Sequence, residues 1–152
     1  MNWEPVLEAL NQLYEDVDQL AGRLHTLHAA RLQCRKGCQA CCVEGITVFE
    51  VEAENICRHH GDLLAQGRPR PEGACAFLDE AGACRIYEHR PYLCRTQGLP
   101  LRWIEDRDGM PVELRDICPL NENEQPIEAL PAEQCWTLGP LEARLATLQA
   151  TA

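Results

Sequence analysis

The sequence has few aromatic residues, since only eight of its 152 residues are Phe, Tyr or Trp. Aromatic packing therefore contributes little to any core. No run of 18 apolar residues occurs, so we expect no membrane-spanning helix. The first residues, MNWEPVLEAL, show no basic region, apolar region or small-residue cleavage site, so we also expect no secretory signal peptide. These absences predict a cytoplasmic protein without a membrane partner.

Lysine is nearly absent, because thirteen of the fourteen basic residues are Arg and the net charge is −10. Positive charge is in excess only in the cysteine-bearing segments 31–45 and 67–104, each of which sums to +2. Arg near a thiolate stabilises its anionic form. Proteins that bind nucleic acid carry a basic footprint, so the acidic flanks argue against such a partner.

Cysteine, by contrast, is abundant: the chain has ten. Such density indicates either disulfides in an oxidising compartment or metal-bound thiolates in a reducing one. Because we expect a cytoplasmic location, we favour metal. The ten residues are Cys34, Cys38, Cys41, Cys42, Cys57, Cys75, Cys84, Cys94, Cys118 and Cys135.

Apolar residues alternate at spacings of four and three along residues 4–30, which predicts a long N-terminal helix. Its stripe contains Val6, Leu10, Leu13, Val17, Leu20, Leu24 and Leu27. This 3.5-residue period fits packing against another helix of the same chain. We favour this interpretation, and a homodimer seam or the docking of a protein partner stays open as the alternative.

The rest of the chain predicts a small α+β fold, which we treat as a single domain, 1–152. We expect a short strand at 45–49, a middle helix at 50–65, a loop at 67–73 and two short β-hairpins at 75–87 and 101–117. The second hairpin has Asp108-Gly109 in its turn. Residues 121–152 should form an acidic loop and a short C-terminal helix. We expect the middle helix to bury Ile56, Cys57, His60, Leu63 and Leu64.

Residues 34–42, CRKGCQACC, contain four cysteines in nine positions. As a helix, this segment would place Cys34, Cys38 and Cys41 on one face, where cysteine acts as a small apolar residue. The polar residues and Gly37 between them favour a loop that wraps a metal. Adjacent side chains diverge, so Cys41 and Cys42 suit two metal centres, or two irons of one cluster, better than one ion.

The ordered pattern C-x3-C-x2-C-C, C-x-F-L-D, G-x-C-R-I-Y-E-x-R-P-x-x-C-R and C-P resembles the CxxCxxCC family, also called YkgJ-like cysteine-cluster proteins. Members are described as zinc- or iron-chelating domains with eight cysteines, or as iron–sulfur proteins. The resemblance covers about residues 34–120. The matching residues are Cys34, Cys38, Cys41, Cys42, Cys75, Phe77, Leu78, Asp79, Gly82, Cys84, Ile86, Tyr87, Glu88, Arg90, Pro91, Cys94, Arg95, Cys118 and Pro119.

This resemblance implies which cysteines bind metal and makes residues 34–120 a cysteine-cluster core. Cys57 and Cys135 lie outside the pattern, and we interpret them as structural. We expect Arg90 and Arg95 to stand behind the ligands and to neutralise thiolate charge or bind backbone carbonyls, with an anionic substrate or partner as the alternative. The implied metal ligands are Cys34, Cys38, Cys41, Cys42, Cys75, Cys84, Cys94 and Cys118.

Eight thiolates suit two zinc ions with four cysteines each, and four suit an iron–sulfur cluster. We favour the cluster, although the residue types alone do not decide. The first functional hypothesis is a metal-binding protein in electron transfer or metal handling. A cluster-containing enzyme, redox or methyltransferase-like, is the second, because flagellin lysine methylases carry a related cluster. A zinc-stabilised protein-interaction module is the third. The sequence identifies no catalytic residue.

Histidines offer a further set of metal donors. His25 and His28 are three residues apart on the N-terminal helix, and His59 and His60 lie near the end of the middle helix. We interpret His25 and His28 as half-exposed helix surface, and His59 and His60 as residues that close a helix end, where histidine suits the helix dipole. His89 lies within the signature, where it could support a metal ligand by a hydrogen bond.

Overall fold

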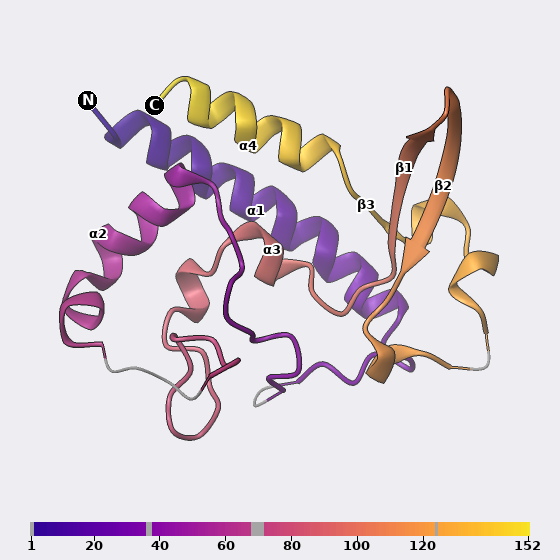
Figure 1. Cartoon of the computed structure of the whole chain (residues 1–152), viewed down its shortest axis with the longest axis horizontal. Coiled ribbons are helices and arrows are strands. Elements are labelled where there is room, and N and C mark those ends of the chain that lie inside the picture. The colour runs from indigo at the N-terminus through magenta and orange to yellow at the C-terminus, as the bar shows by residue number, and fades with distance from the viewer. Residues whose placement is uncertain (1, 36–37, 68–71, 124) are drawn as a thin grey trace.

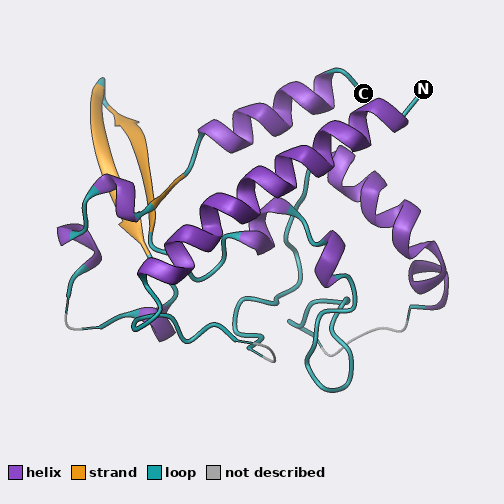
Figure 2. Cartoon of the chain, turned by 180° about the vertical axis from the view of Figure 1, so that it is seen from behind, coloured by secondary structure: helices purple, strands orange, loops and turns teal. Residues whose placement is uncertain are grey.

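The computed structural model describes residues 2–35, 38–67, 72–123 and 125–152. A long helix, α1 (Glu4–Leu27), runs through the middle of the fold, and α4 (Pro140–Ala150) lies alongside α1 (Figure 1). The two termini lie at the same end of α1 in both views (Figures 1 and 2). The α+β prediction, with its long first helix and short last helix, is confirmed.

The core is built on the apolar stripe of α1. Leu10 and Val17 are fully buried, and α1 packs against α2 (Glu50–Gln66), α3 (Tyr92–Arg95) and α4. The stripe is therefore mostly covered by helices of the same chain, which was the first of our alternatives. Leu20 and Leu27, which belong to the predicted seam, are 43% and 55% exposed. A homodimer or protein partner on this helix stays a prediction.

A small sheet completes the regular structure. β1 (Leu101–Arg107) and β2 (Met110–Asp116) form the predicted second hairpin, and Asp108 and Gly109 both have positive φ in its turn. Both residues of a type I′ turn have this conformation. β3 (Trp136–Thr137) pairs with β1 in parallel and gives the order β2-β1-β3. β3 was not predicted, since a two-residue strand has no periodicity to detect.

Two predictions for the middle of the chain are wrong in detail. Residues 45–49 form no strand. The first hairpin is a tight antiparallel loop with one isolated bridge, between Leu78 and Cys84, rather than two strands. Within the described ranges, no strand pairs with either segment to extend these contacts. The predicted loop at 67–73 falls largely on residues 68–71, outside the described residues.

The middle helix is confirmed, but its buried face differs from the predicted one. Val51, Glu52, Asn55 and Ile56 are buried, whereas Cys57 is exposed. Leu64 is exposed as well, because the backbone of α2 departs from helical geometry at His60 and the last turn leaves the core. No described helix is both long and apolar enough to cross a membrane.

Short 3₁₀ turns occupy the remaining connections: η1 (Tyr87–His89), η2 (Pro119–Asn121), η3 (Ile127–Ala129) and η4 (Ala132–Gln134). The cysteine-bearing loops lie together along one side of α1, away from α4 (Figures 1 and 2). The helices thus form a scaffold, and the cysteine segments are carried on it as loops.

Candidate metal centre

The first cysteine segment is a series of turns rather than a helix. The Cys38 N–H donates to Arg35 O at 2.9 Å, and the Cys42 N–H donates to Gln39 O at 2.9 Å. Cys34 is exposed, and Cys38, Cys41 and Cys42 are half-buried. Residues 36 and 37 lie outside the described residues. The loop interpretation of the described part of CRKGCQACC is therefore supported, and its thiols remain accessible to a ligand.

The second segment is a loop closed by its own backbone. The Leu78 N–H donates to Cys75 O, and the Arg85 N–H donates to Phe77 O at 2.9 Å. The Asp79 carboxylate accepts the N–H groups of Ala81 and Ala83, each at 2.9 Å. These bonds fix the tight turn that brings Cys75 and Cys84 to the same end of the loop.

Cys94 is held on the scaffold through its neighbour Arg95. The buried Arg95 guanidinium donates to the Asp18 carboxylate at 2.8 Å and to the carbonyls of Glu88 and Arg90, and it stacks on the Tyr14 ring at 3.8 Å. The contacts with Asp18 and Tyr14 tie α3 to α1, and the bonds to the Glu88 and Arg90 carbonyls tie it to η1 and the residue that follows η1. Arg95 thus anchors the element that carries Cys94, and within the described part of the chain its hydrogen bonds go to a carboxylate and two carbonyls rather than to a thiol.

The two cysteine segments meet directly. The Cys75 N–H donates to Cys42 O at 3.1 Å, the Glu44 N–H donates to Gly73 O at 3.1 Å, and Val43 and Ala74 form an antiparallel bridge. About thirty residues of chain separate the partners of each pair. The first run and the second loop therefore form one continuous cysteine-bearing surface.

Thiol electrostatics place five sulfurs in one group. Burial raises the pKa of Cys42 to about 12, and the charges of Cys41, Cys75, Cys94 and Cys84 add to the rise. Burial likewise raises the pKa of Cys94 to about 11, and the charges of Cys84, Cys41 and Cys75 raise it further. Cys94 as a whole residue is nevertheless exposed. Arg90 opposes the rise at Cys94 and Cys84. Such mutual repulsion requires neighbouring sulfurs, and a cation among them would remove it.

A second group lies at the other end of the first run. Burial raises the pKa of Cys41, and the charges of Cys38 and Cys34 contribute. Cys34 Sγ accepts a hydrogen bond from Asn121 Nδ2 at 3.2 Å, and the Asn121 N–H donates to Cys118 O at 2.8 Å. Asn121 therefore brings Cys34 to the segment that carries Cys118. Cys41 is coupled to both groups.

The cysteines outside the signature have different surroundings. Cys57 is exposed on α2. Cys135 is buried, and its sulfur accepts a hydrogen bond from Arg115 at 3.1 Å while the same guanidinium nitrogen contacts the carbonyls of Ile127 and Leu130. This arrangement ties the acidic loop to β2. A structural role for Cys135 fits these contacts.

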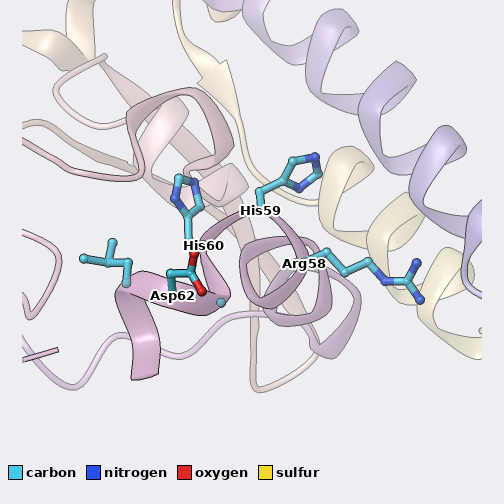
Figure 3. Close-up of a pocket in the computed structure, with 6 residues that line it drawn as sticks. Arg58, His59, His60 and Asp62 are labelled. Atoms are coloured by element: carbon cyan, nitrogen blue, oxygen red, sulfur yellow. The ribbon is translucent and has the colours of Figure 1, made fainter. Parts of the chain in front are cut away.

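Three histidines meet where α2 approaches η1. His59 stacks on His89 with ring centroids 3.9 Å apart, and His60 Nε2 lies 3.0 Å from His89 Nδ1. His59 and His60 also line a surface pocket of about 390 Å³ together with Arg58 and Asp62 (Figure 3). This grouping was not predicted, because 29 positions of chain separate His60 from His89. Of the two N-terminal histidines, His28 is buried and bonds Gln134 O at 2.6 Å.

The donor set fits a thiophilic metal, since all ten cysteines are free, seven of the signature cysteines lie on adjoining loops and the eighth, Cys94, lies on α3. Among the described His, Cys, Asp and Glu side chains, however, no three are arranged to hold one ion. Metal–sulfur bonds are about 2.3 Å long. To bind one ion, the loops would therefore have to close around it. Segments that contain only turns and isolated bridges can move in this way more readily than helices can.

The fold and the free thiols define a small α+β protein with a cysteine-cluster site on loops. Residues 33–125 match the CxxCxxCC family model, described as "putative zinc- or iron-chelating domain". This match covers more than half of the chain, and the protein belongs to that family. No curated protein and no solved structure matches it.

Proposed function

We propose that the eight signature cysteines hold metal as two neighbouring groups of four. Cys42, Cys75, Cys84 and Cys94 would form one group, and Cys34, Cys38, Cys41 and Cys118 the other. The charge coupling among the first four sulfurs supports the first group. The Asn121 contacts to Cys34 and Cys118 support the second. Cys41 and Cys42 would stand at the junction, each facing its own group.

The observation that carries this proposal is the backbone tie between the two segments. The bond from the Cys75 N–H to Cys42 O makes the cysteines of the first run neighbours of those in the second loop. Cysteines that served only as small buried residues would have no reason to gather on half-exposed loops. A shared metal site gives a reason for both their number and their accessibility.

For the cofactor we propose an iron–sulfur cluster, with zinc as the competing occupant. Four thiolates satisfy either one [4Fe–4S] cluster or one tetrahedral zinc. With a cluster, the protein would act in electron transfer. With zinc, metal handling is the better proposal. We also propose a cytoplasmic location, where the thiols would stay reduced.

Metal analysis and an absorption spectrum of anaerobically purified protein test this function. Iron and acid-labile sulfide with visible charge-transfer bands would support the cluster, and a reductive titration would then show whether it transfers electrons. Stoichiometric zinc without visible absorption would replace the cluster by zinc sites. A chain that is folded without bound metal, and that takes up neither metal, would overturn the proposal.

Single substitutions test the ligand set. We expect Cys38→Ala, Cys84→Ala or Cys94→Ala to lose metal from at least one group. Cys57→Ala and Cys135→Ala should retain the wild-type metal content, because their surroundings are separate from both groups. Equal metal loss from Cys57→Ala would show that the division into ligands and bystanders is wrong.

A further inference from the structure

Asn121 is a buried polar residue whose hydrogen bonds converge on one cysteine. It is fully buried at the end of η2, three residues after Cys118. Its Oδ1 accepts the Gln33 N–H at 2.7 Å. Its Nδ2 donates to Gly98 O at 2.8 Å and to Cys34 Sγ at 3.2 Å. The side chain thus joins the segment before Cys34 to the segment after α3.

The surrounding groups fix the orientation of the Asn121 amide. Gln33 presents a backbone N–H, which can only donate, so it must face Oδ1. Gly98 presents a carbonyl, which can only accept, so it must face Nδ2. The second Nδ2 hydrogen is then left for Cys34 Sγ. A flipped amide would lose both backbone bonds, so the N–H···S contact follows from the network.

Gly98 provides the surface on which the sulfur rests. Its φ is +89°, in the region that favours glycine, and a Cβ at this position would overlap Cys34 Sγ. The same Cβ would lie 3.0 Å from Asn121 Nδ2. Cys34 nevertheless remains an exposed residue. One side of its sulfur is therefore held by Gly98 and Asn121, while another side is open to a ligand.

We propose that Asn121 is a positioning residue for Cys34, and that Gly98, which has no side chain, leaves the space that the Cys34 sulfur occupies. Its role in metal binding rests on the proposed function, whereas its hold on the thiol does not. The amide donates to the sulfur and offsets part of the thiolate charge. Hydrogen bonds of this kind to a ligand typically change metal affinity by about 10–100-fold and tune cluster potentials.

The first test compares two buried asparagines. Asn121→Leu removes the donor to Cys34. Asn55→Leu is the matched control, because Asn55 is also fully buried but its side-chain amide has no hydrogen-bond partner among the residues that the structure describes. We expect metal transfer to a chelator to accelerate about 10–100-fold in Asn121→Leu, in line with the loss of a ligand's hydrogen-bond partner. Asn55→Leu should match the wild type.

The second test compares two glycines with similar backbone conformation. Gly98 and Gly109 have φ of +89° and +81°, but a Cβ on Gly109 would meet nothing within 4 Å. Gly98→Ala and Gly109→Ala therefore impose similar backbone strain, and only Gly98→Ala displaces the Cys34 sulfur. We expect faster metal loss in Gly98→Ala alone. Equal rates in the two variants would remove Gly98 from the proposal.

A third measurement uses the metal-free full-length chain and is independent of the proposed function. Peptide-resolved alkylation by iodoacetamide should change at Cys34 in Asn121→Leu relative to the wild type, because the sulfur loses the side chain that holds one of its sides. If Asn121→Leu fails to fold, the Asn121 side-chain N–H resonances in wild type and Cys34→Ala decide instead. We expect a slowly exchanging N–H that shifts in Cys34→Ala. Unchanged alkylation in a folded Asn121→Leu, or unshifted resonances, would overturn the proposal even if the protein binds metal.

Discussion

The helical scaffold and the cysteine loops are stabilised in different ways. Along α1, Leu10 and Val17 are fully buried among apolar neighbours from α2, α3 and α4. In the cysteine loops, residues 38–49 and 72–86, backbone turns and two isolated bridges replace regular elements. Only Leu78 and Ile86 among the apolar residues of those loops are buried. Apolar burial can stabilise the first region. The second region has little apolar burial, so we expect its stability to depend on the backbone hydrogen bonds between the loops and on the proposed metal.

Metal removal should separate the two regions most strongly. Structural zinc contributes about 10–16 kcal/mol in small domains, as much as the whole stability of about 5–15 kcal/mol of a typical protein. We expect a chelator to abolish amide-exchange protection in residues 75–94 while α1 stays largely helical. Hydrogen exchange measured by mass spectrometry, with far-UV circular dichroism, tests this. Unchanged protection in residues 75–94 would show that the loops do not need metal.

The scaffold should respond to the opposite perturbation, a cavity in its core. Leu10→Ala removes a fully buried side chain, and such changes cost about 2–5 kcal/mol. Leu20→Ala is the control on the same helix, because Leu20 is 43% exposed and surface changes stay within about 0.5 kcal/mol. Chemical denaturation measures both. Metal per folded chain should stay at the wild-type value, and similar destabilisation by the two variants would contradict the core assignment.

The sequence predicted the helices of the scaffold well, because an amphipathic helix can be recognised from the regular spacing of its apolar residues. The stripe from Val6 to Leu24 marked α1, and Asp108-Gly109 marked the turn between β1 and β2. The cysteine loops have a characteristic spacing of cysteines but no periodicity of apolar residues. The resemblance to the family therefore identified the site, whereas the strand expected at 45–49 did not form. The partners of Asn121, Gly98 and His89 are distant in sequence and could not be read from it. A polar residue shortly after the C-P pair was the only available signal for Asn121.

Glu52 joins the two regions, and its loss should affect both. The carboxylate is 2% exposed and accepts hydrogen bonds from Tyr14 Oη at 2.9 Å and from the Tyr92 N–H at 2.6 Å. Burial, followed by the charge of Glu52, raises the pKa of Tyr14, so its hydroxyl stays protonated and donates. Tyr92 begins α3, which carries Cys94.

Glu52→Ala would leave two buried donors without an acceptor, at a cost of about 1–3 kcal/mol for each unsatisfied group. Because α3 loses its tie to α2, we also expect faster metal release, which distinguishes this variant from Leu10→Ala. Glu52→Gln keeps an acceptor oxygen and is the control, with a smaller effect on both thermal unfolding and metal release. Wild-type metal release in a destabilised Glu52→Ala would show that the scaffold and the loops are not coupled here.

The histidine contact between α2 and η1 should give the smallest effect, a pH dependence. Burial lowers the pKa of His89, and the charges of His59, His60 and Arg95 lower it further, while Glu88 opposes them. The unfolded chain then binds the proton more readily than the folded one, so stability falls as the pH drops below about 6.5, the ordinary histidine value. His60 Nε2 and His89 Nδ1 lie 3.0 Å apart. A hydrogen bond between them requires one ring nitrogen that is unprotonated and can accept, so the bond is lost when both rings are protonated.

Thermal unfolding at pH 7.5, 6.5 and 5.5 measures this dependence, and we expect His89→Gln to flatten it. His25 also contributes with the same sign, since burial lowers its pKa, so His25→Gln should flatten the profile separately. The carboxyls of Asp16, Glu105 and Glu113, whose pKa values are lowered by hydrogen bonds from neighbouring side chains, lose their effect only at lower pH. Acid also protonates thiolate ligands, so metal content must be measured at each pH. If His89→Gln keeps the wild-type slope while metal content is constant, the histidine contact does not link α2 to the cysteine loops through protonation.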